Sequence, residues 1–150
     1  MRLIADTSGI LAAIDTADPR HEACHAALTQ AAVAVITPLV IAEVHYLLCR
    51  RGHTEAATDF LTDVASGFYR LTDPTPEDYH AAGELIVKYD GQMRRERRQP
   101  GSLDLADAMN VVAGRRWNVH VILTLDADYR SVRPLSSHPA FVLAPCDLPV

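Results

Sequence analysis

Acidic side chains lie in four separate, mostly apolar stretches of this 150-residue chain. They are Asp6 after the run LIA, Glu43 within LVIAEVHYLL, the pair Asp104 and Asp107 in SLDLADA, and Asp126 in ILTLDADY. A carboxylate that is buried in apolar surroundings loses its hydration, which costs free energy unless a partner compensates it. If the fold brings these four stretches together, we expect a divalent cation to provide that compensation.

Most of these acids also have an ordinary structural explanation. Asp6 closes a strand or caps the next helix, and the D-x-x-D spacing of Asp104 and Asp107 fits a helix cap. Asp126 and Asp128 are residue types that commonly form turns. Two interpretations therefore remain for these acids: one shared site, or separate roles as helix caps and turn residues.

Glu43 is the hardest of the acids to explain by local structure. Val40 and Leu47 lie three and four positions away and share its face of the expected helix. Glu43 is therefore expected to point towards the core side of the helix, where a carboxylate needs a partner. A structural salt bridge is the alternative to a functional role.

The residue types in the four stretches favour a hard cation. Carboxylate oxygens suit Mg²⁺ or Mn²⁺, and such an ion can activate water for attack on phosphorus. Without a cation, clustered carboxylates repel one another and at least one pKa should rise. Apart from His45, the stretches lack the Cys and His ligands typical of zinc, and His21 and His25 fit a solvated helix surface.

The composition predicts one domain over residues 1–150. A hydrophobic share of 49% is sufficient for a core in a chain of this length. Cys24, Cys49 and Cys146 are widely spaced and read as free thiols. No signal peptide or membrane span is apparent, so a cytoplasmic location without membrane association is expected. The net charge of −5 argues against a broadly basic surface for nucleic acid, but not against a local one.

Strand-like runs alternate with helical stretches along the chain. Strands are expected at Arg2 to Ala5, Val33 to Ile36, Phe68 to Leu71, Val119 to Leu125 and Phe141 to Leu143. Helices are expected at 10–14, from Pro19, at 38–50, at 54–65 with Thr54 as cap, and from Pro76 to Tyr89. An exposed loop is expected at 92–101, followed by a helix that Ser102 or Asp104 caps and that ends at about Arg116. This order predicts an α/β fold with a mostly parallel sheet covered on both faces. Because ligands bind beyond the carboxyl ends of such strands, Asp6 and Asp126 are expected at the edge where sites form.

The chain resembles a known family at this point. The segments IADTSGILAAID, TPLVIAEVHYLL and LDLADAMNVVAGRRWNVHVILTLDADYRSVRP are similar to PIN-domain ribonucleases, specifically the VapC-type toxins of bacterial type II toxin–antitoxin systems. The resemblance covers nearly the whole chain. It implies a three-layer α/β/α sandwich with a parallel central sheet and a metal-dependent endoribonuclease activity that inhibits translation and growth.

The resemblance also implies a role for individual residues. The catalytic acids would be Asp6, Glu43, Asp107 and Asp126. Asp6, Asp107 and Asp126 would hold the metal, which would be Mg²⁺ or Mn²⁺, and Glu43 would ligate it or orient the attacking water. Supporting hydroxyls would come from Ser8 or Thr7 and from Thr124. The roles of Asp104 beside Asp107, and of Asp128 beside Asp126, remain open.

The expected partners follow from the same resemblance. An RNA substrate, single-stranded or in a loop of tRNA or rRNA, would be cut by a homodimer that a small antitoxin inhibits. An arginine cluster before the third acidic stretch, Arg94, Arg95, Arg97 and Arg98, is a candidate for phosphate contacts or an ordinary solvated loop. The alternatives are a stand-alone RNA-processing PIN nuclease and an inactive PIN fold that only binds.

Overall fold

The computed structural model describes residues 1–95 and 103–148, with the backbone alone for residues 90–95. Its five strands form one sheet in the order β3-β2-β1-β4-β5, and every neighbouring pair is parallel. The strands are β1 (Arg2–Ala5), β2 (Val33–Ile36), β3 (Tyr69–Leu71), β4 (Val121–Leu123) and β5 (Val142–Ala144). The predicted α/β class with a mostly parallel sheet is therefore confirmed.

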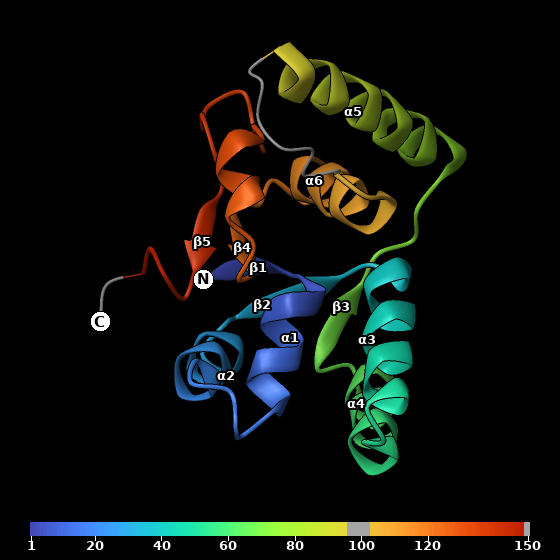
Figure 1. The fold of residues 1–150 in the computed structure, drawn as a ribbon, viewed down its shortest axis with the longest axis vertical. Coiled ribbons are helices and arrows are strands. Elements are labelled where there is room, and N and C mark those ends of the chain that lie inside the picture. The colour runs from blue at the N-terminus through green and yellow to red at the C-terminus, as the bar shows by residue number, and fades with distance from the viewer. Residues whose placement is uncertain (96–102, 149–150) are drawn as a thin grey trace.

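Helices cover both faces of the sheet (Figure 1). They are α1 (Thr7–Ile14), α2 (His21–Thr29), α3 (Pro38–Arg50), α4 (Thr54–Ser66), α5 (Pro76–Arg95) and α6 (Leu105–Trp117), with a 3₁₀ helix η1 (Ala127–Ser131). In β1, Leu3 and Ala5 pack into the core under α1 to α4, whereas Ile4 packs into the core under α5 and α6. This alternation is the period of two expected for a strand buried on both sides, and it produces the three layers.

Several helix boundaries differ from the prediction. Helix α1 begins at Thr7 and not at Ile10, because Asp6 caps it, and α2 begins at His21 and not at Pro19. Helix α5 continues through Gly91 to Arg95, because one glycine costs a helix only about 1 kcal/mol and does not end it by itself. Residues 92–95 of the expected loop are thus helical, and its remainder lies outside the described residues. Thr54 is the first residue of α4 and not its cap; the cap is His53, whose backbone N–H donates to the carbonyl of Leu48 in the turn after α3.

Strand β4 is shorter than the predicted run from Val119 to Leu125. Ile4 and Ala5 of β1 pair with Ile122 and Leu123, and β1 then turns into α1. The residues after Leu123 therefore have no β1 partner to extend the ladder. They are used for the turn into η1, an element that the sequence pattern did not predict.

The site edge of the sheet lies where the strand order reverses. From the central strand β1 the chain adds β2 and β3 on one side, and β4 and β5 are added on the other. The backbone N–H of Asp6 donates to the carbonyl of Leu123 at 3.1 Å, so the ends of β1 and β4 are joined directly. Such a switch point is the usual place for a ligand site in an open parallel sheet.

Two further expectations concern the whole chain. Cys24, Cys49 and Cys146 are free thiols, as predicted. None of the described helices combines the length and the apolar character needed to cross a bilayer.

Candidate active site

Asp6 lies at the centre of a buried polar network at the switch point. Its side chain is only 5% exposed and caps the start of α1. Its Oδ2 accepts hydrogen bonds from the hydroxyls of Ser8 and Thr124, both at 2.8 Å, and its Oδ1 accepts one from the amide of Asn110 at 3.1 Å. Burial raises the pKa of Asp6, while the hydroxyl donors oppose that rise.

Asp107 is the second acid of this network. The hydroxyl of Tyr129 donates to Asp107 Oδ1 at 2.8 Å and lies 3.5 Å from Asp6 Oδ1, so one hydroxyl connects the two carboxylates. Burial, and then repulsion by Asp104, raise the pKa of Asp107 to about 7, although the Tyr129 hydrogen bond lowers it. The fold therefore brings together two acids that are 101 positions apart in the sequence.

Asp104 serves the helix itself. It is exposed and caps α6: its Oδ1 accepts from the backbone N–H of Asp107 at 2.9 Å, and Asp107 Oδ2 accepts from the backbone N–H of Asp104 at 3.3 Å. This reciprocal arrangement is a capping box. The helix-cap reading of the D-x-x-D spacing is therefore confirmed. Asp107 is also linked to Asp6 through the Tyr129 hydroxyl, and its catalytic role stays a prediction.

Glu43 is brought to the same edge by α3. Thr37 caps this helix, accepting from the backbone N–H of Val40 at 3.3 Å, and Pro38 is its first residue. Glu43 is half-buried, and its Oε2 accepts a hydrogen bond of 2.7 Å from the hydroxyl of Thr7. Its partner is thus a hydroxyl next to Asp6, and the alternative of a salt bridge is absent from the described residues.

Asp126 does not touch the other three acids in this structure. Its Oδ1 accepts from the backbone N–H of Asp128 at 2.8 Å and so caps η1. The chain turns immediately after β4, and in this turn the Asp126 carboxylate caps the neighbouring 3₁₀ helix. Its backbone N–H donates to Thr124 Oγ1 at 3.0 Å, so Asp126 is connected to Asp6 only through that threonine.

The hydroxyls predicted as supporting groups all make contacts within the network. Thr7 contacts Glu43, whereas Ser8 and Thr124 contact Asp6 and lie 3.0 Å from each other. The backbone N–H of Leu125 donates to Ser8 Oγ at 2.9 Å and ties the start of α1 to the end of β4. The choice between Thr7 and Ser8 that the sequence left open is therefore resolved into two different contacts.

Two residues of the network were missed by the sequence reasoning. Asn110 is fully buried and donates from Nδ2 to Asp6 Oδ1 and to the hydroxyl of Tyr129, both at 3.1 Å. Asn110 follows Asp107 by one helical turn in an apolar stretch, which is the signal that singled out Glu43. Tyr129 gave no comparable signal, because it lies in the unpredicted η1.

The predicted arginine cluster cannot be placed in the site. The side chains of Arg94 and Arg95, and all of Arg97 and Arg98, lie outside the described residues. Their role in holding RNA stays a prediction.

The oxygen donors at this edge fit a hard divalent cation. Among the residues that the structure describes, no three His, Cys, Asp or Glu side chains are arranged to hold a metal ion together. Mg²⁺, however, is usually bound by one or two carboxylates and several waters, and Asp6 and Asp107 supply two. The Oδ1 atom of Asn110, buried and without a donor among the described residues, adds one more oxygen to the set.

The raised pKa values predict how the stability of the metal-free protein depends on pH. The folded-state pKa of Asp107, about 7, lies above the ordinary value, so its contribution is fully present near pH 4 and is lost as the pH rises through 7. Asp6 acts in the same direction. We expect the melting temperature in EDTA to fall between pH 5 and 8, and to fall less in Asp107→Asn.

The difference between the wild-type protein and Asp107→Asn isolates this effect. Burial lowers the pKa of His120, which raises stability with pH below about 6.5 in both proteins and cancels in the difference. Asp18 and Asp147 have lowered pKa values and titrate below this window. Parallel melting curves for the two proteins over pH 5–8 would contradict the prediction.

Comparison with known proteins places this geometry in a family. A model of the PIN domain matches residues 3–134 of the chain. Ribonuclease VapC26 of Mycobacterium tuberculosis is 33% identical over 135 residues, which cover 89% of this chain and 93% of that protein.

Two solved structures share the fold. VapC20 of Mycobacterium tuberculosis, a sarcin–ricin loop cleaving toxin, superposes with a TM-score of 0.70 at 23% identity over 84% of this chain and 91% of that chain. VapBC2 of Rickettsia felis, bound to a DNA fragment from its promoter, gives a TM-score of 0.60 at 16% identity over 90% and 96% of the two chains. At these identities the likeness shows the fold alone.

Proposed function

This chain belongs to the PIN-domain family, and from that membership we propose that it is a divalent-metal-dependent endoribonuclease that acts as the toxin of a type II toxin–antitoxin pair. The observation that carries the proposal is the pairing of the buried Asp6 with the half-buried Asp107 through the Tyr129 hydroxyl, with Glu43 held beside them through Thr7. The 33% identity to a ribonuclease over most of both chains supports the same activity.

The proposed roles follow from the contacts of each acid. Asp6 and Asp107 would hold a Mg²⁺ or Mn²⁺ ion, with Asp126 as the third candidate ligand. When bound, the ion supplies positive charge for the phosphodiester oxygens and makes water more acidic. The hydroxyls of Ser8 and Thr124 keep Asp6 ionised and oriented, because each donates to Oδ2.

Glu43 is proposed to accept the proton of the attacking water. Its Oε2 is held by the Thr7 hydroxyl, which leaves Oε1 to receive a hydrogen bond from water. The Thr7 contact also fixes the direction of the carboxylate relative to Asp6. Asn110 and Tyr129 keep the two metal-binding carboxylates side by side by donating to them.

Cleavage of a labelled single-stranded RNA by the purified protein tests the activity. We expect cleavage with Mg²⁺ or Mn²⁺ and none in EDTA. Folded protein that cuts no RNA with either ion would overturn the proposal and would favour an inactive PIN fold that only binds.

Replacing Glu43 with Gln should slow cleavage by roughly 10²- to 10³-fold at unchanged affinity for RNA. The amide oxygen of Gln still accepts from Thr7, but it cannot take a proton from water. Single-turnover rates and binding isotherms measure the two quantities separately. Glu55→Gln is the matched control, since Glu55 lies exposed in the first turn of α4. Equal rates for Glu43→Gln and Glu55→Gln would remove Glu43 from the mechanism.

The biological role is tested by expression in a bacterial host. We propose that residues 1–150 form one PIN domain, and that the protein is cytoplasmic, forms a homodimer and is inhibited by a small antitoxin. An antitoxin is expected to be encoded by a small gene next to that of this protein. Growth should stop when the wild-type protein is expressed and resume when this antitoxin gene is co-expressed. RNA cleavage without growth arrest would favour a stand-alone RNA-processing nuclease.

A further inference from the structure

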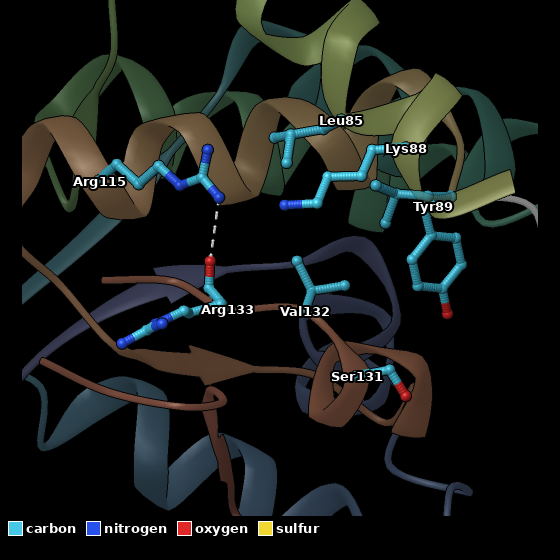
Figure 2. Close-up of a pocket in the computed structure, with 8 residues that line it drawn as sticks. Leu85, Lys88, Tyr89, Arg115, Ser131, Val132 and Arg133 are labelled. Atoms are coloured by element: carbon cyan, nitrogen blue, oxygen red, sulfur yellow. Dashed lines mark hydrogen bonds between the residues drawn. The ribbon is translucent and has the colours of Figure 1, made fainter. Parts of the chain in front are cut away.

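Apart from the acidic network, a pocket lies between α5, α6 and the segment from the end of η1 onwards. Residues from all three elements line it (Figure 2): Leu85, Lys88, Tyr89, Leu103, Arg115, Ser131, Val132 and Arg133. Its volume is about 120 Å³, well above the roughly 10–15 Å³ that one water needs. The pocket can therefore take a group larger than a single solvent molecule.

Positive charge gathers at this pocket, and none of the described residues that line it is acidic. Figure 2 shows Lys88 and Arg115 pointing towards each other from α5 and α6. Arg133 also belongs to the lining, although its guanidinium points away from Lys88. Two facing cations repel each other, and an anion between them would reverse this unfavourable energy.

None of the three cations is neutralised by a carboxylate in the described part of the chain. Arg115 donates only to the carbonyls of Arg133 and Pro134, at 3.1 and 3.3 Å, and Arg133 only to the carbonyls of Leu135 and Ser136. Lys88 is exposed and makes no hydrogen bond or ion pair with a described residue.

Three arginines elsewhere in the described part of the chain behave differently. Arg20, Arg116 and Arg130 each pair with an aspartate, at 3.0, 2.7 and 2.6 Å. The chain as a whole has 19 acidic residues and 14 lysines and arginines, a net charge of −5. What distinguishes the pocket is that three cations without a carboxylate partner among the described residues line the same cavity, which fits an anionic ligand.

We propose that this pocket binds a backbone phosphate of the RNA strand that is cut at the acidic site. Lys88 and Arg115 contact the phosphate oxygens, and Leu85 and Val132 form the apolar side against the sugar or base. The inference rests on the proposed ribonuclease activity and extends it to how the substrate is held.

The position of the pocket relative to the acids supports a shared strand. Asp107 and Arg115 lie on the same helix, eight residues apart, which is about 12 Å along its axis. At about 3.4 Å per stacked nucleotide, that distance is three to four nucleotides. The segment with Tyr129 in the acidic network continues directly into Ser131 and Val132 of the pocket.

Binding of a labelled ten-nucleotide RNA in EDTA, measured by fluorescence anisotropy at several salt concentrations, tests the inference. Lys88→Gln should weaken binding equally for RNAs of different sequence, and should reduce the slope of log affinity against log salt by about 0.7. Lys88→Arg should keep the wild-type slope. Lys88 is the better position for the test, because Arg115 also donates hydrogen bonds to the carbonyls of Arg133 and Pro134. Replacing Arg115 would therefore change the structure of that segment as well as the charge.

Arg70→Gln is the matched control for loss of one positive charge. Arg70 is exposed on the edge strand β3, and its guanidinium has no partner among the described residues. A slope that is unchanged in Lys88→Gln, or reduced equally in Arg70→Gln, overturns the inference while RNA cleavage leaves the proposed function standing. A wild-type protein that binds no RNA overturns both. Inorganic phosphate that competes with RNA in the wild-type protein but not in Lys88→Gln supports the pocket as the phosphate site.

Discussion

Replacing Asp6 with Asn is expected to reduce the rate of RNA cleavage about 10³-fold. A cation at a phosphodiester is worth several kcal/mol of transition-state stabilisation, and each 1.36 kcal/mol is a factor of ten. Asp6 is the acid with the most direct contacts in the network, so its charge is the one that the proposed ion depends on most. Single-turnover cleavage at saturating Mg²⁺ measures the loss.

The same substitution should leave the protein folded. The Asp6 carboxylate is buried and its pKa is raised, so a neutral amide of the same shape removes a desolvation cost. We expect the melting temperature in EDTA at pH 8 to be equal to or higher than that of the wild-type protein. This separates loss of chemistry from loss of structure.

Asp59→Asn serves as the control for Asp6→Asn, because Asp59 is exposed on α4. It should change neither the cleavage rate nor the melting temperature. A folded Asp6→Asn protein that cuts RNA within about threefold of the wild-type rate would place the reaction elsewhere on the molecule.

Replacing Gly9 with Ala is expected to have the largest effect on stability. A Cβ at this position would lie 2.5 Å from the carbonyl oxygen of Leu123 and 2.6 Å from its Cγ. Because the carbonyl belongs to the backbone of β4, α1 has to move away from the sheet. Such overpacking costs about 1–3 kcal/mol or more, and the melting temperature should fall by roughly 5–10 °C.

Activity should fall together with stability in Gly9→Ala. Gly9 follows Asp6, Thr7 and Ser8 directly, so a shift of α1 carries these side chains away from Thr124 and Glu43. A displacement near 1 Å is enough for a loss of about 10²-fold in rate. Thermal denaturation and cleavage assays below the melting temperature measure the two effects.

Gly83→Ala is the matched control for the added methyl group. Gly83 is exposed within α5, and a Cβ there meets no atom within 4 Å. Alanine is the better helix former, so this protein should gain about 0.5–1 kcal/mol of stability. If Gly9→Ala melted as high as the wild-type protein, the close approach of α1 to β4 would be wrong.

Much of the fold was predictable because local patterns carry it. The apolar runs of β1 and β2 have the composition of strands buried on both faces, and Thr37-Pro38 marks the start of α3 in both the sequence and the structure. The family resemblance, stated on three segments, was confirmed by a PIN model that matches residues 3–134. Where a boundary was wrong, as at Gly91 or after Leu123, the helix or the neighbouring strand outweighed the local signal.

The sequence by itself determined which acids interrupt apolar stretches, and therefore which carboxylates needed a partner. Only the tertiary structure decided which partner each acid has. Asn110 and Tyr129 reach Asp6 across 104 and 123 positions, and no local pattern encodes such a contact. The order of the strands brings the ends of β1 and β4 together, and this order depends on packing across the whole sheet. The same packing sets Asp107 against Asp6, turns Asp126 towards η1, and gathers Lys88 and Arg115 around one pocket.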